Sequence, residues 1–255
     1  MGTSTEVQHF SGQGRFSFAE RDALGNPTGG YTFLGDCSKL DLKCTVERKE
    51  HNEHQSGFNG VDNVFESANK VEMNFTLDEI IKEALNLYVY GNTTEVAAAS
   101  ITAEAATAYL GKETPTAFIP DGAVTVTNVG GATTYVLGTD YKIGSTGMIY
   151  IPPTGSAITD GQDLELNYQS KDERVTTAFT QQNKPYYFRF DGLNRADDGK
   201  EVVVEIYKGR CNPAEMVDLI NEDFATYSVN GMALYDNCHA DNSLTGAYFR
   251  VRLAG

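Results

Sequence analysis

The chain has 255 residues, 40% hydrophobic and 22% charged, which is typical of a globular protein and excludes a disordered one. Its 35 acidic and 20 basic side chains give a formal net charge of −15, so the chain repels nucleic acid and anionic membranes by default. No apolar run approaches the roughly 20 residues that span a bilayer, and we expect no membrane partner.

The N-terminal part begins with an arm and two short strands. Residues 1–12 are polar and contain Gly, Ser and Thr, which predicts an extended arm. Aromatic residues over 16–20 and again over 31–34 predict two strands. Between them, residues 22–30 hold the Asn, Pro and Gly that favour turns. We therefore expect a first pair of strands joined by this turn.

Two longer strands come next, and both alternate polar with apolar side chains. Over residues 38–47 the apolar face carries Leu40 and Leu42, and over residues 70–76 it carries Met73. A period of two predicts strands with one buried face. The polar faces carry Lys39, Asp41, Lys43, Thr45 and Glu47 on the first strand and Lys70, Glu72, Asn74 and Thr76 on the second.

The connector between these strands, residues 48–69, is polar and charged. It is far longer than an ordinary hairpin turn of about 2–5 residues, and a loop of that length is usually functional or disordered. We expect this segment to contact another subunit, and nothing in it resembles a catalytic centre.

A short amphipathic helix is predicted directly after the second strand, over residues 77–91. Thr76 is the expected N-cap, and Glu79 completes a capping box with it. Gly91 is the expected stop. The apolar stripe, which we expect to pack on a sheet, consists of Ile80, Ile81, Ala84, Leu85 and Tyr88.

The composition changes in the middle of the chain. Residues 97–108 are rich in alanine and fit either a short helix or a linker. Over 116–168 the chain is rich in Thr, Val, Ile, Tyr and Gly, with short apolar runs divided by turn residues. That spacing predicts a small β module. We place it at 109–178, as an insertion between a first part, 1–108, and a second part, 179–255.

Strands resume after the module. Residues 186–190 and 202–207 are apolar and aromatic and predict two strands joined by a polar loop. A second capped helix is predicted to start at Asn212, with Pro213 in its first turn. Residues 247–253 alternate polar with apolar side chains and predict a final strand.

Residues with the potential for catalysis or metal binding are few. His51 and His54 are three residues apart, a spacing that two metal ligands can have. No third ligand follows at the spacing of a known metal motif, so we favour the interpretation that both histidines lie on a solvated surface. The sequence contains no P-loop, no G-x-S-x-G and no G-x-G-x-x-G motif. We therefore expect no enzymatic activity, no metal and no cofactor. Basic residues form no aromatic-interleaved stripe along the sequence, which argues against a nucleic-acid-binding face.

Two blocks of the sequence carry a recognisable pattern. The first runs from FLGDC at 33–37 through the charged segment ERKEHNEHQSGFNG to VEMNFTLDEI and the helix end LNLYVYG. The second joins YYFRFDGLN at 186–194 to the strand at 202–207 and the predicted helix start at 212–213. Together these blocks resemble the tail tube protein, or major tail protein, of bacteriophages with long non-contractile tails. The resemblance implies a mainly β fold of the β-sandwich or β-barrel type, with one or two short α-helices.

The resemblance also implies a structural virion protein without catalysis. Proteins of this family form six-subunit rings that stack into a tube, and viral DNA is ejected through the lumen without specific binding. The implied partners are further copies of the chain, together with tape measure, tail terminator and distal tail proteins. The implied location is the phage tail of the virion, after assembly in the cytoplasm of the bacterial host.

Two contact surfaces follow from the resemblance. The polar faces of the two long strands are candidates for the lumen, although their Lys residues depart from a purely acidic, DNA-repelling bore. The lumen-facing candidates are Lys39, Asp41, Lys43, Glu47, Lys70, Glu72, Asn74 and Thr76. The candidates for contact with the adjacent ring are Arg48, Lys49, Glu50, His51, Glu53, His54, Phe58, Asp62 and Phe65.

A function of a different class is the alternative: a carbohydrate- or receptor-binding β-sandwich module of a virion. Its binding surface would lie within residues 116–168, where aromatic rings suit stacking on sugars. Packing between neighbouring strands explains the same rings, and we favour that interpretation. The rings concerned are Tyr135, Tyr141, Tyr150 and Tyr168.

Overall fold

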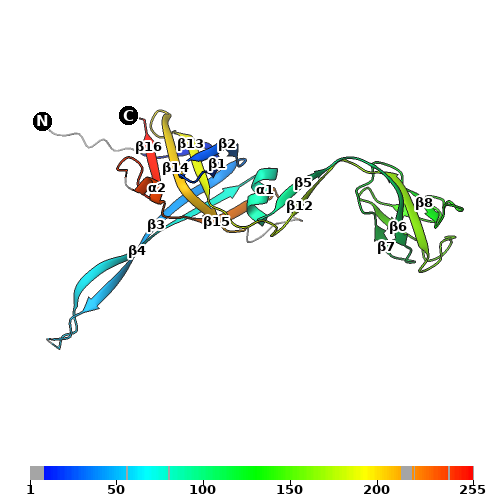
Figure 1. The fold of residues 1–255 in the computed structure, drawn as a ribbon, viewed down its shortest axis with the longest axis horizontal. Coiled ribbons are helices and arrows are strands. Elements are labelled where there is room, and N and C mark those ends of the chain that lie inside the picture. Colours follow the sequence, from blue (N-terminus) through cyan, green and yellow to red (C-terminus); the bar gives the residue numbers. More distant parts are fainter. Residues whose placement is uncertain are drawn as a thin grey trace. The chain divides into compact units, whose positions relative to one another are not determined.

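The structure is a computed structural model, and its described residues form a mainly β protein with two short helices (Figure 1). This confirms the mainly β fold that the sequence predicts. The chain divides into two compact units: unit 1 comprises Met1–Asn92 and Thr176–Gly255, and unit 2 comprises Thr93–Val175. The structure describes residues 9–55, 57–79, 81–213, 220, 222–240 and 242–254.

Unit 1 is built on an eight-stranded antiparallel sheet. The strand order is β2-β1-β13-β14-β15-β4-β3, and β16 pairs with β14 beside β15. The bounds are β1 (Gly12–Arg21), β2 (Pro27–Phe33), β3 (Cys37–Asn52), β4 (Val61–Leu77), β13 (Tyr186–Asn194), β14 (Lys200–Cys211), β15 (Tyr227–Ala233) and β16 (Phe249–Leu253).

Strand β14 joins the two halves of this sheet. Its first part, Val202 to Ile206, pairs with β16, and its last part, Gly209 to Cys211, pairs with β15. The ladder with β13 changes register between these two parts. A bulge at this point adds twist and lets one edge of β14 serve two strands in succession.

The sheet curves so that strands distant in the order face one another across the core. The ring of Phe16 on β1 lies 5.2 Å from the ring of Phe75 on β4 and 5.6 Å from that of Phe188 on β13. The apolar face predicted for β4 is buried, with Met73 fully enclosed. Helix α1 (Lys82–Val89) closes this core with side chains from one face, namely Ala84, Leu87 and Tyr88.

The predicted cap of the first helix is wrong. Thr76 and Leu77 end strand β4, where they pair with β15, and Thr76 Oγ1 lies 3.1 Å from the hydroxyl of Ser228. Leu77 is fully buried. Its burial and its ladder bonds favour the strand over the capping box that Thr76 and Glu79 would form.

The helix is also shorter than the predicted span of 77–91. Ile81 precedes the first helical turn without a side-chain cap. Tyr90, in the left-handed region, follows the last helical residue and comes before the predicted stop at Gly91. Ile80, which the sequence places in the apolar stripe, lies outside the described residues.

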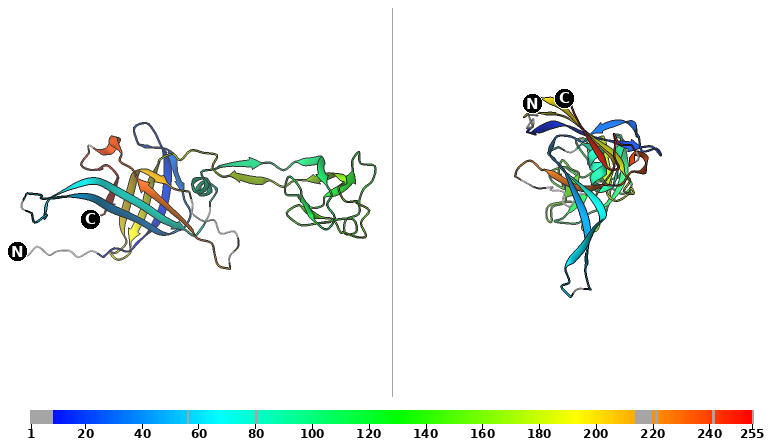
Figure 2. Two further views of the ribbon diagram at one scale, coloured as in Figure 1. Left: turned by 90° about the horizontal axis from the view of Figure 1, so that it is seen from below. Right: turned by 90° about the vertical axis from the view of Figure 1, so that its left-hand side faces the viewer.

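The predicted loop over 48–69 is also wrong, because most of it is a two-stranded ladder. Strand β3 continues to Asn52 and β4 begins at Val61, so the turn covers only the residues between them. Both faces of this far part of the hairpin are exposed to solvent, so polar residues suit both faces. The alternation of polar and apolar residues that marks a half-buried strand is therefore missing from the sequence here. Figure 2 shows the far end of the β3–β4 hairpin extending past the other strands of unit 1.

Unit 2 has its own core and its own small sheets. Two three-stranded sheets have the orders β7-β10-β9 and β6-β11-β8, and β5 pairs with β12. The strands are β5 (Asn92–Val96), β6 (Ser100–Thr107), β7 (Glu113–Pro115), β8 (Thr125–Asn128), β9 (Lys142–Ile143), β10 (Met148–Tyr150), β11 (Asp163–Gln169) and β12 (Glu173–Thr177). The unit starts earlier than the predicted boundary at 109, because the alanine-rich segment is neither helix nor linker but strand β6, paired with β11.

The C-terminal part contains a helix that the sequence did not predict. Helix α2 (Asn237–Ala240) is a single turn that precedes β16. The strand predicted over 247–253 is present as β16. Most of the helix predicted after Asn212 falls on residues 214–219, which lie outside the described residues.

Candidate assembly surfaces

The polar faces of β3 and β4 form one continuous surface at the base of the hairpin. The ladder pairs Lys39 with Thr76, Asp41 with Asn74 and Lys43 with Glu72, and the next pair on this face is Thr45 with Lys70. Seven of the eight lumen-facing candidates therefore lie together. The eighth candidate, Glu47, lies farther out, opposite Ala68. Cross-strand partners share a face because side chains alternate along both strands.

Charges on this surface are interleaved. Lys70 Nζ lies 2.8 Å from one oxygen of Glu72, and Lys43 Nζ lies 3.3 Å from the other. Hydrogen bonds from these two lysines hold the pKa of Glu72 below its usual range, and Glu72 raises the pKa of Lys70. Both groups are therefore charged at neutral pH. Lys39 Nζ contacts Asp41 at 2.7 Å, which gives the surface a second interleaved pair.

The same surface extends onto two strands that sequence reasoning left out. Strand β15 pairs Asn230 with Asn74 and Met232 with Glu72. Strand β14 then pairs Arg210 with Met232. The sequence analysis predicts a strand over 202–207 but none over 227–233, and no local signal says that β14 and β15 continue the face of β4. The surface therefore covers four strands instead of two.

The far half of the hairpin carries every residue predicted to contact an adjacent ring. His51 Nδ1 lies 2.6 Å from Asp62 Oδ1, and Arg48 reaches Glu66 at 3.6 Å across the ladder. These pairs are exposed, and exposed pairs add about 0–1 kcal/mol to stability. Phe58 is 89% exposed and Phe65 is 55% exposed. Exposed aromatic rings on a projecting element are typical of a surface that another protein covers.

Several strand edges of the unit 1 sheet carry no partner within the described part of the chain: those of β2, β3 and β16. The β2 edge is irregular, since Gly29 and Gly30 both adopt left-handed φ values and its register with β1 shifts there. Such irregularity obstructs pairing with a further strand. Strand β3 pairs with β4 without a register shift from Lys39 to Glu47, and β16 pairs with β14 without one from Phe249 to Leu253. The outer edges of these two stretches offer unpaired backbone groups.

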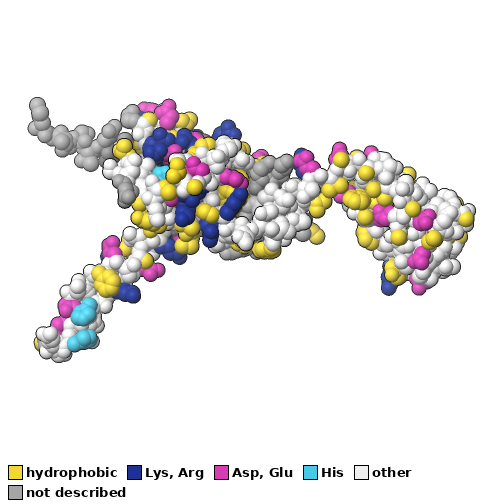
Figure 3. Space-filling view, viewed as in Figure 1, with side chains coloured by type: hydrophobic (Ala, Val, Ile, Leu, Met, Phe, Trp, Pro, Cys, Tyr) yellow, Lys and Arg dark blue, Asp and Glu magenta, His cyan; other side chains and the backbone are white. Residues whose placement is uncertain are grey.

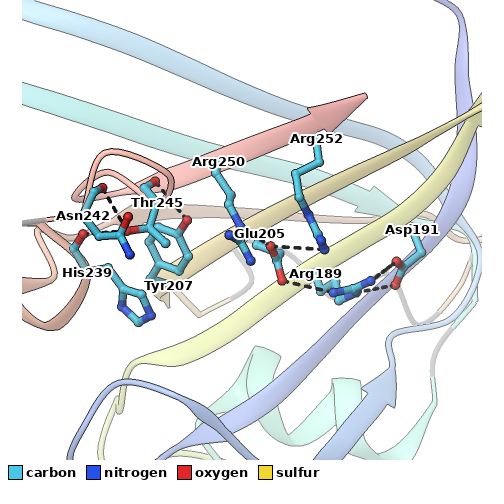
Figure 4. Close-up of polar contacts among 9 residues, drawn as sticks. All are labelled: Arg189, Asp191, Glu205, Tyr207, His239, Asn242, Thr245, Arg250 and Arg252. Carbon is cyan, nitrogen blue, oxygen red and sulfur yellow. Dashed lines mark hydrogen bonds and ion pairs between the residues drawn. The ribbon is translucent and has the colours of Figure 1, made fainter. Parts of the chain in front are cut away.

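An ion cluster anchors β16 to the sheet next to its free edge (Figure 4). Glu205 on β14 is buried and contacts Arg189 at 3.1 Å, Arg250 through a close hydrogen bond, and Arg252 at 3.4 Å. Burial alone would raise the pKa of Glu205, but the hydrogen bond from Arg250 and the three positive charges lower it. Arg189 also forms a forked contact with Asp191. No pattern in the sequence predicts this cluster, because its members come from three strands.

The N-terminal arm is described only from residue 9. The backbone N–H of Ser11 donates to the side chain of Asn194 at 2.9 Å, and the Asn194 amide donates to the carbonyl of His9 at 2.9 Å. These bonds attach the start of the described chain to the end of β13. Residues 1–8 of the predicted arm lie outside the described residues.

The tyrosines considered for sugar stacking in unit 2 are mostly core residues. Tyr135, Tyr141 and Tyr168 are buried, and the Tyr141 hydroxyl donates to the carbonyl of Val124 at 2.6 Å. Tyr150 is half-buried. Three of the four rings therefore offer no face to a ligand, as the packing interpretation predicts.

Within the described ranges, no three His, Cys, Asp or Glu side chains are grouped so that they could hold a metal ion. His51 and His54 have ring centroids 6.0 Å apart on the exposed hairpin. No helix of the described chain has the length and apolar character needed to cross a membrane.

Comparison with known proteins gives one family. The family model described as Protein of unknown function UCP028589 matches residues 9–252. That range contains unit 2 and nearly all of unit 1. No curated protein matches the sequence.

Proposed function

This chain belongs to the UCP028589 family of proteins of unknown function, and we propose that it is a structural subunit that assembles with copies of itself into a bacteriophage tail tube. Six subunits form each ring, rings stack into a tube, and DNA leaves through the lumen. The ring number and the tube come from the resemblance of residues 33–91 and 186–213 to major tail proteins. The chain acts in the virion and performs no catalysis.

The observation that carries this proposal is the β3–β4 hairpin, with its exposed rings beyond the sheet. The apolar side chains near its end are Phe58, Val61, Val64 and Phe65, each between 48% and 89% exposed. An isolated two-stranded ladder has no core of its own and is marginally stable in water. A second copy that covers this end would remove apolar surface from water and order the hairpin.

The free edges of β3 and β16 support lateral joining of subunits. On β16, Val251 and Leu253 are about half exposed on one face, and Arg252 is half exposed on the other. On β3, Val46 is exposed on the apolar face and Asp41 lies on the polar face. If the edges of β3 and β16 paired, apolar side chains of the two strands would lie next to one another on one face. On the other face, Arg side chains of β16 would lie next to Asp side chains of β3. Such pairing would also satisfy the unpaired backbone groups of both edges.

The polar surface shared by β3, β4, β15 and β14 suits the lumen of such a tube. In a closed ring of sheets, each sheet has one face against a core and one face against water. This sheet is divided in that way: Met73 is buried in the core, and the neighbouring Glu72 lies on the polar face. At the two ends of the tube, the resemblance assigns contacts to tape measure, tail terminator and distal tail proteins.

Negative-stain electron microscopy of the purified full-length protein over a concentration series tests the proposal. We expect rings at intermediate concentration and hollow tubes at high concentration. Small particles at every concentration would contradict self-assembly and favour the alternative of a receptor-binding virion module.

A hairpin variant tests the part assigned to β3–β4. Lys49 and Phe65 face each other in the ladder, so Asn-Gly in place of residues 50–64 closes the shortened hairpin with a two-residue turn. We expect the variant to keep the circular dichroism spectrum and rings of the parent but to form no stacks. Long tubes from this variant would remove the hairpin from ring stacking.

A further inference from the structure

The polar surface at the base of the hairpin has a charge opposite to that of the whole chain. Its basic side chains come from three strands, β3, β4 and β14, and its carboxylates from two of them. The cations are Lys39, Lys43, Lys70, Lys208 and Arg210, and the carboxylates are Asp41, Glu47 and Glu72. In Figure 3, Lys and Arg side chains gather on unit 1 over the region of β3, β4, β14 and β15. A positive surface on a chain of net charge −15 indicates a partner of negative charge.

Strand pairing holds these cations in a regular array. One row across the sheet runs from Arg210 through Met232 and Glu72 to Lys43. The backbone N–H of Leu234, which follows β15, donates to the carbonyl of Lys208, so Lys208 lies on β14 one row beyond Arg210. Rows on one face of a sheet are two residues apart along a strand, about 7 Å, so Lys208 and Arg210 on β14 lie within a Debye length of about 10 Å of each other. The same holds for Lys43 and Lys70, which lie on neighbouring strands in adjacent rows.

Not all of the positive charge in this array is compensated. Lys39, Lys43 and Lys70 share Asp41 and Glu72 between them. Within the described part of the chain, neither Lys208 nor Arg210 forms an ion pair with a carboxylate. Lys39 and Lys43 remain about two-thirds exposed despite their partners, so they also stay available to an external anion.

Resting on the proposed function, we infer that this four-stranded surface attracts the phosphate backbone of nucleic acid. The remaining rows carry side chains that hydrogen-bond to phosphate oxygens without charge: Thr45, Asn74, Thr76, Ser228 and Asn230. The surface is a sheet face without a helix or ribbon that would enter a groove and read base edges. The contact is therefore independent of sequence, weak and sensitive to salt.

Such a surface changes the character of the bore expected for the tube. A purely acidic lumen repels DNA everywhere, whereas alternating Lys and carboxylate groups give brief attraction at many equivalent positions. Weak contacts of this kind let a protein and DNA slide along each other. The carboxylates within the array prevent it from holding the DNA tightly.

Fluorescence anisotropy with a short labelled DNA duplex tests the inference on the full-length protein, below the concentration at which rings form. We expect binding at about 50 mM NaCl that weakens steeply by about 200 mM. The double variant K208E/R210E should lower the affinity by about tenfold or more and reduce the slope of log affinity against log salt by about 2. Because Lys208 and Arg210 are outside the ion pairs of the surface, this variant leaves those pairs intact.

The matched control is K112E/K142E, which makes the same change in net charge at two exposed positions of unit 2. We expect this variant to bind DNA nearly as the parent does. No binding by the parent at low salt, or equal losses in both variants, would overturn the inference. If K208E/R210E still binds DNA but no longer forms rings, the inference is also overturned. The surface would then be assigned to contact with an acidic face of a second copy of the chain.

Electron microscopy of the same samples separates this inference from the proposed function. Tubes from a protein that does not bind DNA would overturn the inference alone. DNA binding that depends on Lys208 and Arg210, from a protein that never forms rings, would overturn the proposed function alone.

Discussion

The phenol ring of Tyr207 on β14 stacks on the imidazole of His239 in α2, with ring centroids 4.2 Å apart and an interplanar angle of 6°. The Tyr207 hydroxyl donates to the carbonyl of Thr245 at 2.9 Å, so one side chain holds both ends of the segment that leads into β16 (Figure 4). The imidazole Nδ1 of His239 lies 2.8 Å from a carboxylate oxygen of Asp236. Stacking and hydrogen bonding together therefore fix α2 against β14.

Asp236 is the buried charge at the centre of this segment. It is 3% exposed and contacts Arg21 at 2.8 Å as well as His239. The variant D236N leaves the Arg21 guanidinium without its counter-charge, and we expect a loss of about 3–5 kcal/mol in the free energy of unfolding. Urea denaturation followed by circular dichroism measures this loss. The control E66Q removes an exposed pair and should change stability by less than about 1 kcal/mol. If D236N changed the free energy of unfolding by as little as E66Q does, the ion pair between Arg21 and Asp236 would not stabilise the fold.

Acid should destabilise unit 1 through Asp236 and Glu205. Burial opposes ionisation of both, but their hydrogen bonds and neighbouring positive charges hold each pKa below its usual value. The folded state therefore binds protons less readily than the unfolded state. The stabilisation is complete above the unfolded pKa values, about 3.9 for Asp and 4.3 for Glu, and is lost as the pH falls through the lower folded values.

Urea midpoints at neutral pH and at successively lower pH values measure this dependence. The variant E205Q has no carboxyl to titrate at this position, so its midpoint should fall less between neutral pH and acid than that of the parent. Identical pH profiles for the two proteins would contradict a stabilising role for the ionised Glu205.

Unit 2 should lose stability separately from unit 1. Leu166 on β11 is fully buried in the core of unit 2, which is distinct from the core around Phe16 and Phe75. The variant L166A should lower the stability of unit 2 by about 2–5 kcal/mol through lost burial and a cavity. Hydrogen exchange with mass spectrometry should show weaker protection in β6 and β11 and unchanged protection in β13. The exposed control V175A should alter neither, and a uniform loss across both units would contradict separate cores.

The exposed rings of the hairpin should matter for assembly and not for folding. The variant F58S/F65S replaces two exposed side chains, so we expect a change in stability within about 0.5 kcal/mol. Ring stacking should need a higher protein concentration, which sedimentation velocity measures. The control V136S/L137S removes comparable exposed apolar side chains from unit 2. An equal shift for both variants would mean that general hydrophobicity, and not the hairpin, drives association.

Sequence reasoning succeeded where one face of a strand meets the core. Met73 and Phe75 alternate with Glu72 and Asn74, and the structure buries the first pair and leaves the second on the polar side. It failed at Thr76, where a local capping signal competed with the ladder between β4 and β15 and lost. It also failed over residues 48–69, because a hairpin with both faces in water has no alternation to detect.

The sequence by itself determined the mainly β class and the division of β3 and β4 into polar and apolar faces, because alternation along one strand is a local property. Only the tertiary structure decided that Lys208 and Arg210 lie on the same surface as Lys43 and Lys70, and that three arginines surround Glu205. These residues are far apart along the chain. Which strands pair, and in which register, depends on the packing of the whole sheet and on no pattern within a single strand.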